Sequence, residues 1–224
     1  MNINAADWQV YDSEALLVSA VTDLIEARLR QATSEKGEFH LVFPGGRSIV
    51  AVLQALSKRT LSWKGVHLYL TDERCVARGD NERNDRLVDE YLLSSIVTDP
   101  PVLHRIPAEL GPDNGAQEFA SQLSAAPKFD LVLLGLGEDG HTASLFPDSL
   151  GDQPTEVVAV HHSPKPPLER VSLGYARLAS ARERVVLALG KTKQAVIKRI
   201  RAGELFPVVK AGPDRWFITS DIYA

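Results

Sequence analysis

The chain has 224 residues, 44% of them hydrophobic and 24% charged, and 25 basic against 29 acidic side chains give a net charge of −4. This is a globular composition, and its acidic balance excludes the broad positive field typical of nucleic-acid-binding proteins. A single cysteine excludes an internal disulfide and a multi-cysteine metal site. No apolar run approaches the ~18 residues of a membrane span, and the first residues lack a signal-peptide pattern. We therefore expect a cytoplasmic protein with neither a membrane nor a nucleic-acid partner.

The first half of the chain alternates between helical and strand patterns. Apolar residues recur at helical spacing over 13–31, which predicts an amphipathic helix. The elements predicted after it are strand Phe39–Phe43, helix Ile49–Leu56, strand Val66–Leu70, helix Asp85–Ile96, strand Val102–Ile106 and helix Asp113–Leu123.

The second half continues this alternation. Phe129–Leu134 is the clearest buried strand, since it is apolar on both faces. It is followed by predicted strands Val157–Val160 and Arg184–Leu189, helix Thr192–Arg201 and strand Arg215–Thr219, with a proline-rich surface loop at 163–167. We predict one α/β domain over residues 1–224, a mainly parallel, Rossmann-like doubly wound sheet with helices on both faces. Ligands of such folds bind beyond the carboxyl ends of the strands, so the segments there are candidate sites.

The first of these segments is Pro44–Ser48, which contains two glycines between a strand and a helix. Glycines allow backbone N–H groups to approach an anion closely, and a helix N-terminus favours negative charge. Ser48 can cap that helix, and Arg47 can contact a phosphate with two hydrogen bonds. The spacing is not that of a P-loop, and an ordinary strand-to-helix turn has the same residues.

The second segment, Thr71–Cys75, places two acids and one base directly after a strand. A charge run of this kind is often a solvated loop tip, but the end of a sheet strand is also where catalytic groups lie. Cys75 is interpreted as a small packed residue because no histidine stands at a spacing that suggests a nucleophile pair.

The third segment, Gly135–Pro147, contains the letters GxGxxG but not a dinucleotide site. The fingerprint requires a long helix, which Pro147 would interrupt, and no acid follows at the expected distance. What remains is a flexible loop with Asp139 and His141. Histidine exchanges protons readily near neutral pH, so His141 is either a general base or a structural histidine bonded to a loop carbonyl.

Two further cations, Arg170 and Lys193, stand near other strand ends and gain meaning only if the segments converge on one phosphate. His161 and His162 are adjacent, so on a strand they would point to opposite faces. We see no metal-ligand spacing and no GxSxG elbow, so neither a metal centre nor a serine hydrolase is predicted.

Taken together, these segments resemble the 6-phosphogluconolactonase family. They occur in the order of the family and span residues 43–221. The matching segments are FPGGRS (43–48), TDERCV (71–76), Asn84, LLGLGEDGHTASLFP (133–147), RVSL (170–173), Gly190 and Lys193 of GKTK, Trp216 and Asp221. The chain departs from the family at Ser48, where threonine is common, at Arg83, where serine is common, and at Gly174, where threonine is common.

The resemblance implies hydrolysis of 6-phospho-D-glucono-1,5-lactone in the oxidative pentose phosphate pathway, with no cofactor, no metal and no obligate protein partner. His141 is predicted to activate the attacking water, with Asp139 or Asp72 orienting it and Arg74 offsetting charge on the carbonyl oxygen. The predicted phosphate-binding residues are Gly45, Gly46, Arg47, Ser48, Arg170 and Lys193.

Two alternatives stay open. Glucosamine-6-phosphate deaminases share the phosphate loop and the Asp-Gly-His motif, but theirs is typically followed by Ile-Ala-Phe-Asn-Glu-Pro. Here the motif is followed by 142–147, TASLFP, which has no glutamate at the ring-opening position. A catalytically idle sugar-phosphate-binding regulator on the same fold is the other alternative, and the presence of His141 and Asp72 speaks against it.

Overall fold

The structure, a computed structural model, describes residues 7–147 and 155–223, except for the side chain of Arg47. Its central sheet has seven parallel strands in the order β1-β10-β9-β6-β2-β3-β5. The strands are β1 (Asp7–Tyr11), β2 (Phe39–Phe43), β3 (Val66–Leu70), β5 (Val102–Leu103), β6 (Leu131–Gly135), β9 (Glu183–Ala188) and β10 (Arg215–Thr219). A second, antiparallel sheet has the order β4-β8-β7 and consists of β4 (Asp72–Arg74), β7 (Val157–Val160) and β8 (Arg170–Leu173).

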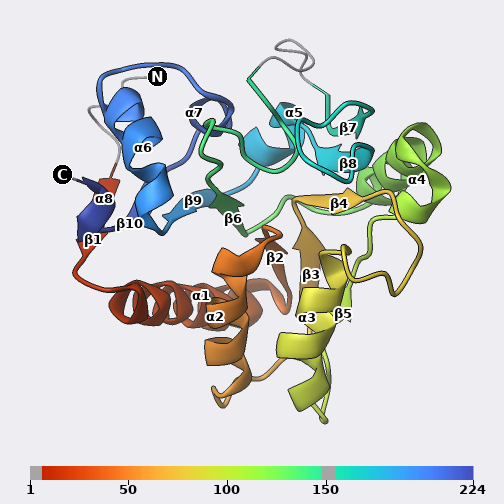
Figure 1. Ribbon diagram of the computed structural model, residues 1–224. Helices are drawn as coiled ribbons and strands as arrows, with labels where there is room; N and C mark the ends of the chain where they lie inside the picture. The colour runs from red at the N-terminus through yellow and green to blue at the C-terminus, as the bar shows by residue number, and fades with distance from the viewer. Residues whose placement is uncertain (1–6, 148–154, 224) are drawn as a thin grey trace.

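Helices cover both faces of the central sheet, which confirms the predicted fold class. They are α1 (Glu14–Lys36), α2 (Arg47–Ser57), α3 (Asp85–Tyr91), α4 (Pro112–Ser124), α5 (Tyr175–Ala179), α6 (Gln194–Arg201), α7 (Pro207–Lys210) and α8 (Ser220–Tyr223). Figure 1 shows α1, α2 and α3 below the sheet, and α4, α5 and the small sheet above it. Within the described ranges, no helix is both long and apolar enough to cross a membrane.

The local sequence explains where these elements begin and end. Strands β2 and β6 are buried on both faces, as expected for central strands of a parallel sheet. Ser13 caps α1 by accepting a hydrogen bond from the Leu16 N–H at 3.3 Å, and Gly37 ends it in the left-handed conformation at φ 80°. Because that glycine is the first strong stop signal, the helix extends beyond the predicted 13–31.

The second sheet departs from the predicted alternation. Val157–Val160 is a strand, as predicted, but it pairs with β8 in the antiparallel sheet. The charged segment Asp72–Arg74 also pairs with β8, so the interpretation of 71–75 as a solvated loop tip is wrong. The predicted helix 85–96 ends at Tyr91 and continues only as a short 3₁₀ turn.

The strand order creates a crevice at the centre of the sheet. From β2 the chain adds β3 and β5 on one side, whereas β6, β9 and β10 lie on the other. The loops that follow β2 and β6 therefore lead away from each other. In doubly wound sheets, this reversal of strand order is where ligands bind.

Candidate active site

A cleft of about 180 Å³ opens at this reversal point, above the carboxyl ends of β2, β3 and β6. Its lining brings together eight of the predicted site residues, which come from widely separated parts of the chain: Gly45, Gly46, Ser48, Asp72, Arg74, His141, Arg170 and Lys193. The predicted role of the Arg47 side chain lies outside what the structure describes. The loop 136–146 contains no helix, in agreement with the prediction that this segment is not a dinucleotide site.

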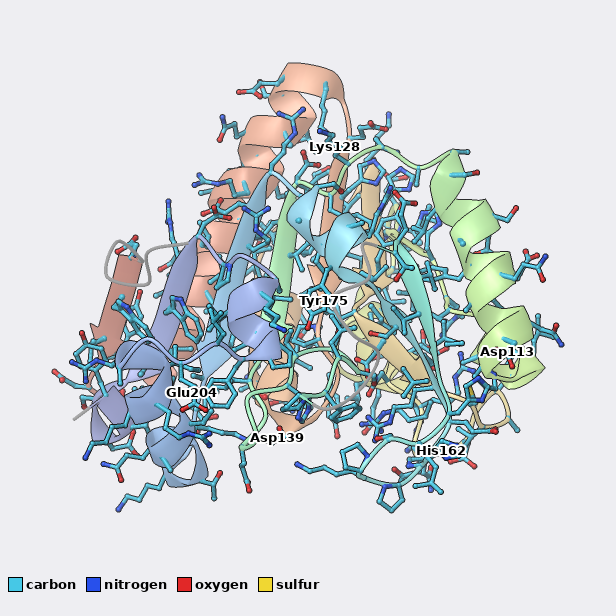
Figure 2. All side chains as sticks on the ribbon, turned by 90° about the horizontal axis from the view of Figure 1, so that it is seen from above. Asp113, Lys128, Asp139, His162, Tyr175 and Glu204 are labelled. Atoms are coloured by element: carbon cyan, nitrogen blue, oxygen red, sulfur yellow. The ribbon has the colours of Figure 1, made fainter. Side chains whose placement is uncertain are left out.

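His141 is held in the cleft by Asp139. The Nδ1 atom of the histidine lies 2.5 Å from the Asp139 Oδ1 atom, which also accepts the His141 backbone N–H at 3.2 Å. Burial acts to raise the pKa of Asp139, but the hydrogen bond and the charge of His141 outweigh it and hold the pKa well below its usual value. In the view of Figure 2, Asp139 lies between the segment with Glu204 and the loop with His162. With Nδ1 engaged, Nε2 is the nitrogen available to a ligand or water.

Two glycines make this pairing possible. A Cβ atom on Gly137 would lie 2.0 Å from the His141 Nδ1 atom and 2.5 Å from the Asp139 Oδ1 atom. Gly140 has φ +83°, and a Cβ atom there would lie 2.1 Å from the ring of Phe206. The loop thus needs glycine at both positions, at Gly137 for space and at Gly140 also for backbone conformation.

Asp72 has different partners. Its carboxylate is buried and accepts hydrogen bonds from the hydroxyls of Ser144 at 2.6 Å and Thr71 at 3.1 Å. The guanidinium of Arg170 lies 3.9 Å away. Between the two acids that the sequence left open as partners of His141, the structure places Asp139 against the histidine, whereas Asp72 joins the loop 136–146 through Ser144.

The neighbouring Glu73 anchors the segment that follows Arg83. Its fully buried carboxylate accepts backbone N–H bonds from Arg74, Asn84 and Asp85 at 2.7–2.8 Å. Burial raises the pKa of Glu73 to about 7, against the opposing effect of these N–H bonds and of Arg83. Asn84 is thereby fixed against the glycine-rich turn, and its side chain donates to the Asp72 carbonyl oxygen at 2.9 Å.

The end of the cleft that is predicted to bind phosphate combines a glycine-rich backbone turn with the side chain of a lysine. Gly46 has φ 84° and precedes the first helical residue of α2, so the prediction that Ser48 caps this helix is wrong. Ser48 lies in the first turn instead, and its side chain lines the cleft. Lys193 comes from the turn after β9, and its Nζ atom lies 3.9 Å from the Glu138 carboxylate. Burial lowers the pKa of Lys193, with Glu138 acting in the opposite direction.

The two arginines of the cleft also have structural partners. Arg170 donates from Nε to the Pro167 carbonyl oxygen at 3.1 Å and from one terminal nitrogen to that of Lys165 at 2.8 Å. Arg74 donates to the Glu82 carbonyl oxygen at 2.7 Å, whereas its buried Nε atom has no hydrogen-bond partner among the described residues. Part of each guanidinium thus supports a loop, and both residues line the cleft.

Sequence reasoning missed Lys165 as a cleft residue, and it gave no role to Thr71 although it named the segment 71–75. Lys165 belongs to the proline-rich loop, which Arg170 folds back over the cleft, and no spacing in the sequence signals that fold. Cys75 is half-buried, and burial raises the pKa of its thiol to about 11, which disfavours a thiolate nucleophile.

Comparisons with known proteins agree on one family. Residues 12–216 match the model of the family described as glucosamine-6-phosphate isomerases/6-phosphogluconolactonase. The 6-phosphogluconolactonase of Streptomyces coelicolor is 33% identical over 214 residues, which cover 87% of this chain and 82% of that protein. The GDH/6PGL endoplasmic bifunctional protein of Oryctolagus cuniculus is 38% identical over 192 residues, and the match spans 80% of this chain but only 24% of that protein.

Solved structures show the same fold. The crystal structure of 6-phosphogluconolactonase from Thermotoga maritima superposes with a TM-score of 0.87 at 25% identity, covering 96% of this chain and 100% of that one. A monomeric glucosamine-6-phosphate deaminase also superposes, with a TM-score of 0.78 at 15% identity. The second likeness concerns the fold alone.

Proposed function

The chain belongs to the family of glucosamine-6-phosphate isomerases and 6-phosphogluconolactonases, and we propose that it is a lactonase of that family. It hydrolyses 6-phospho-D-glucono-1,5-lactone to 6-phospho-D-gluconate, a step of the oxidative pentose phosphate pathway. The observation that carries this proposal is the carboxylate-held His141 in one cleft with the glycine-rich turn and Lys193. A relative that this chain matches over most of both lengths bears the name 6-phosphogluconolactonase.

The phosphate of the substrate binds at the turn that follows β2. The backbone N–H groups of Gly45 and Gly46 and the hydroxyl of Ser48 supply neutral donors, and Lys193 supplies the positive charge. Arg170, which lines the same cleft, adds a second positive charge. This grip on a remote group aligns the lactone carbonyl with the histidine, which lowers the entropic part of the barrier.

His141 acts as the general base. Its Nε2 atom takes a proton from water while the water oxygen forms a bond to lactone carbon C1. The intermediate then collapses by breaking the bond between C1 and the ring oxygen, and the imidazolium returns the proton to that oxygen. Asp139 holds the ring in one tautomer and stabilises its charged form. Arg74, on the cleft wall, offsets the negative charge that develops on the carbonyl oxygen.

The test is a coupled assay with freshly generated 6-phosphogluconolactone, corrected for spontaneous hydrolysis. The native chain should accelerate lactone opening, and His141→Ala should lower kcat by ~10² or more with binding of 6-phosphogluconate nearly intact. A His141→Ala variant with near-normal turnover would eliminate this residue as the base.

The same preparation separates the alternative functions. Release of ammonia from glucosamine-6-phosphate without lactone hydrolysis would identify a deaminase and overturn the proposal. Binding of 6-phosphogluconate with activity in neither assay would identify a sugar-phosphate-binding regulator.

A further inference from the structure

A cluster of histidines lies far from the cleft, between the central sheet and α4. His40 on β2 and His67 on β3 are partners in register, and their rings stack at 4.6 Å with an angle of 5° between the planes. Glu38 stands just before β2. One potential ligand atom from each of these three residues lies within 4.8 Å of those of the other two. Two imidazoles and a carboxylate form a donor set that suits zinc and related transition metals.

The second ring nitrogen of each histidine is already engaged. His40 Nδ1 lies 3.1 Å from the Tyr69 hydroxyl, and His67 Nδ1 lies 2.9 Å from His104 Nε2. Tyr69 and His104 in turn stack on each other at 4.4 Å. Metal-binding histidines usually have such an outer partner, which fixes the tautomer and leaves the other nitrogen for the ion. Here the nitrogens left over are the two Nε2 atoms.

His40 provides an independent sign of a missing ligand. Its side chain is 3% exposed, yet its Nε2 atom has no hydrogen-bond partner in the described part of the chain. The Glu38 Oε1 atom lies 3.5 Å from this nitrogen. Buried polar atoms are rarely left without a partner, so this nitrogen calls for an explanation. An ion between His40 and Glu38 would supply one.

The surroundings leave room for an ion and for the small movements by which the donor atoms would close around it. A cavity of about 300 Å³ borders all of these residues, with Phe119 and Leu123 of α4 on its apolar wall. A tetrahedral ion with bonds of ~2.0–2.1 Å holds its ligands roughly 3.3 Å apart, so the donor atoms must draw together. Glu38 can move because its side chain is 41% exposed. Its neighbour Lys36 lies 3.9 Å away but bonds Asp130 at 2.9 Å.

We propose that Glu38, His40 and His67 bind a divalent transition-metal ion such as Zn²⁺, with Tyr69 and His104 as outer partners. The site lies at the amino ends of β2 and β3, whereas the cleft lies at their carboxyl ends. In Figure 2, Lys128, which is next to the cavity-lining Pro127, and Asp139 of the cleft lie at opposite ends of the molecule. The ion therefore stabilises the fold by joining β2 to β3 and does not take part in the hydrolysis.

The test uses the full chain after treatment with a chelator. Calorimetric titration with Zn²⁺ should reveal one strong site per chain, and Co²⁺ should develop the visible absorption bands of a low-coordinate ion. Glu38→Gln and His67→Gln each remove a ligand and should weaken binding by more than ~100-fold, while Tyr69→Phe removes an outer partner and should weaken it by ~10- to 100-fold. Zn²⁺ should also raise the Tm of the native chain but not of Glu38→Gln, whose exposed position keeps folding intact.

Matched controls identify where the ion binds. The double variant His161→Gln/His162→Gln removes an adjacent pair of exposed histidines, and His141→Asn removes the histidine of the cleft. Both should bind Zn²⁺ like the native chain. Lactone hydrolysis should be the same in Glu38→Gln and native protein. The proposal is overturned if the native chain does not bind Zn²⁺, if Glu38→Gln and His67→Gln leave binding unchanged, or if either control abolishes it.

Discussion

The substitution Gly137→Ala tests whether the position of His141 limits the reaction. Cβ contacts under 3.0 Å are essentially never seen, and the new methyl group would lie 2.0 Å from the His141 Nδ1 atom. The histidine must therefore move by about 1 Å. A displacement of ~1 Å in a catalytic group can cost roughly 100-fold in rate, so we expect kcat to fall by about that factor. The fold should be retained, because Gly137 is not among the residues with positive φ.

Gly135→Ala, at the last residue of β6 and two positions before Gly137, is the matched control. Its Cβ atom would meet only the Cβ atom of Pro44, at an ordinary contact distance of 3.5 Å. We expect its kcat to stay within about twofold of the native value, since a catalytic group that does not move keeps its rate. Both variants are compared in the lactone assay, with thermal unfolding as the check on folding. Native-like turnover in Gly137→Ala, or equal losses in both variants, would refute the positional argument.

Three further predictions concern charge. Lys193→Ala should raise KM roughly 10- to 150-fold, because a charge-assisted phosphate contact contributes ~1.5–3 kcal/mol to binding. Lys191→Ala, at an exposed position, should leave KM unchanged. Equal KM values in the two variants would remove Lys193 from the phosphate site. Arg83→Ala should lower the free energy of unfolding in urea by ~3–5 kcal/mol, because it removes the buried cation that lies beside Glu73 and Asp85. Arg86→Ala, at a half-buried position, should cost less than ~0.5 kcal/mol. The pKa of Glu73 is raised from 4.5 to about 7, so its protonated form stabilises the fold. This contribution to the free energy of unfolding is complete below pH 4.5 and is lost as the pH rises through 7. Glu73→Gln should abolish this part of the pH dependence, and an unchanged pH dependence in the variant would contradict the assignment.

The parts of the fold that sequence alone predicts are those whose residues share one environment. The predicted bounds of Phe39–Phe43 and Val66–Leu70 match the structure, because a short, mainly apolar run with a single histidine is typical of a buried strand. Asp72–Arg74 could not be found in that way. Its charged side chains are typical of a loop, and only pairing with β8 and bonds to distant residues make it a strand.

The candidate site likewise has a part that the sequence predicts and a part that only the structure shows. Motifs at strand ends predicted the cleft because parallel strands carry their carboxyl ends to the same edge. The choice between Asp139 and Asp72 as the partner of His141 needed three-dimensional contacts, since Asp72 is engaged by Ser144, a residue 72 positions away. The histidines of the second cluster lie on different strands, so no local spacing connects His40 to His67.

The pairing of the first and last strands has a consequence for how the fold combines with others. β1 and β10 lie side by side at one edge of the central sheet (Figure 1). The ring of Trp8 on β1 stacks on that of Trp216 on β10, with 4.6 Å between the ring centres. Strands β10 and β9 separate β1 from β6, whose loop carries His141. A further domain attached before β1 would thus join at the flank of the sheet, with two strands between it and β6. Such geometry suits gene fusion, and the GDH/6PGL endoplasmic bifunctional protein of Oryctolagus cuniculus matches this chain over only 24% of its own length.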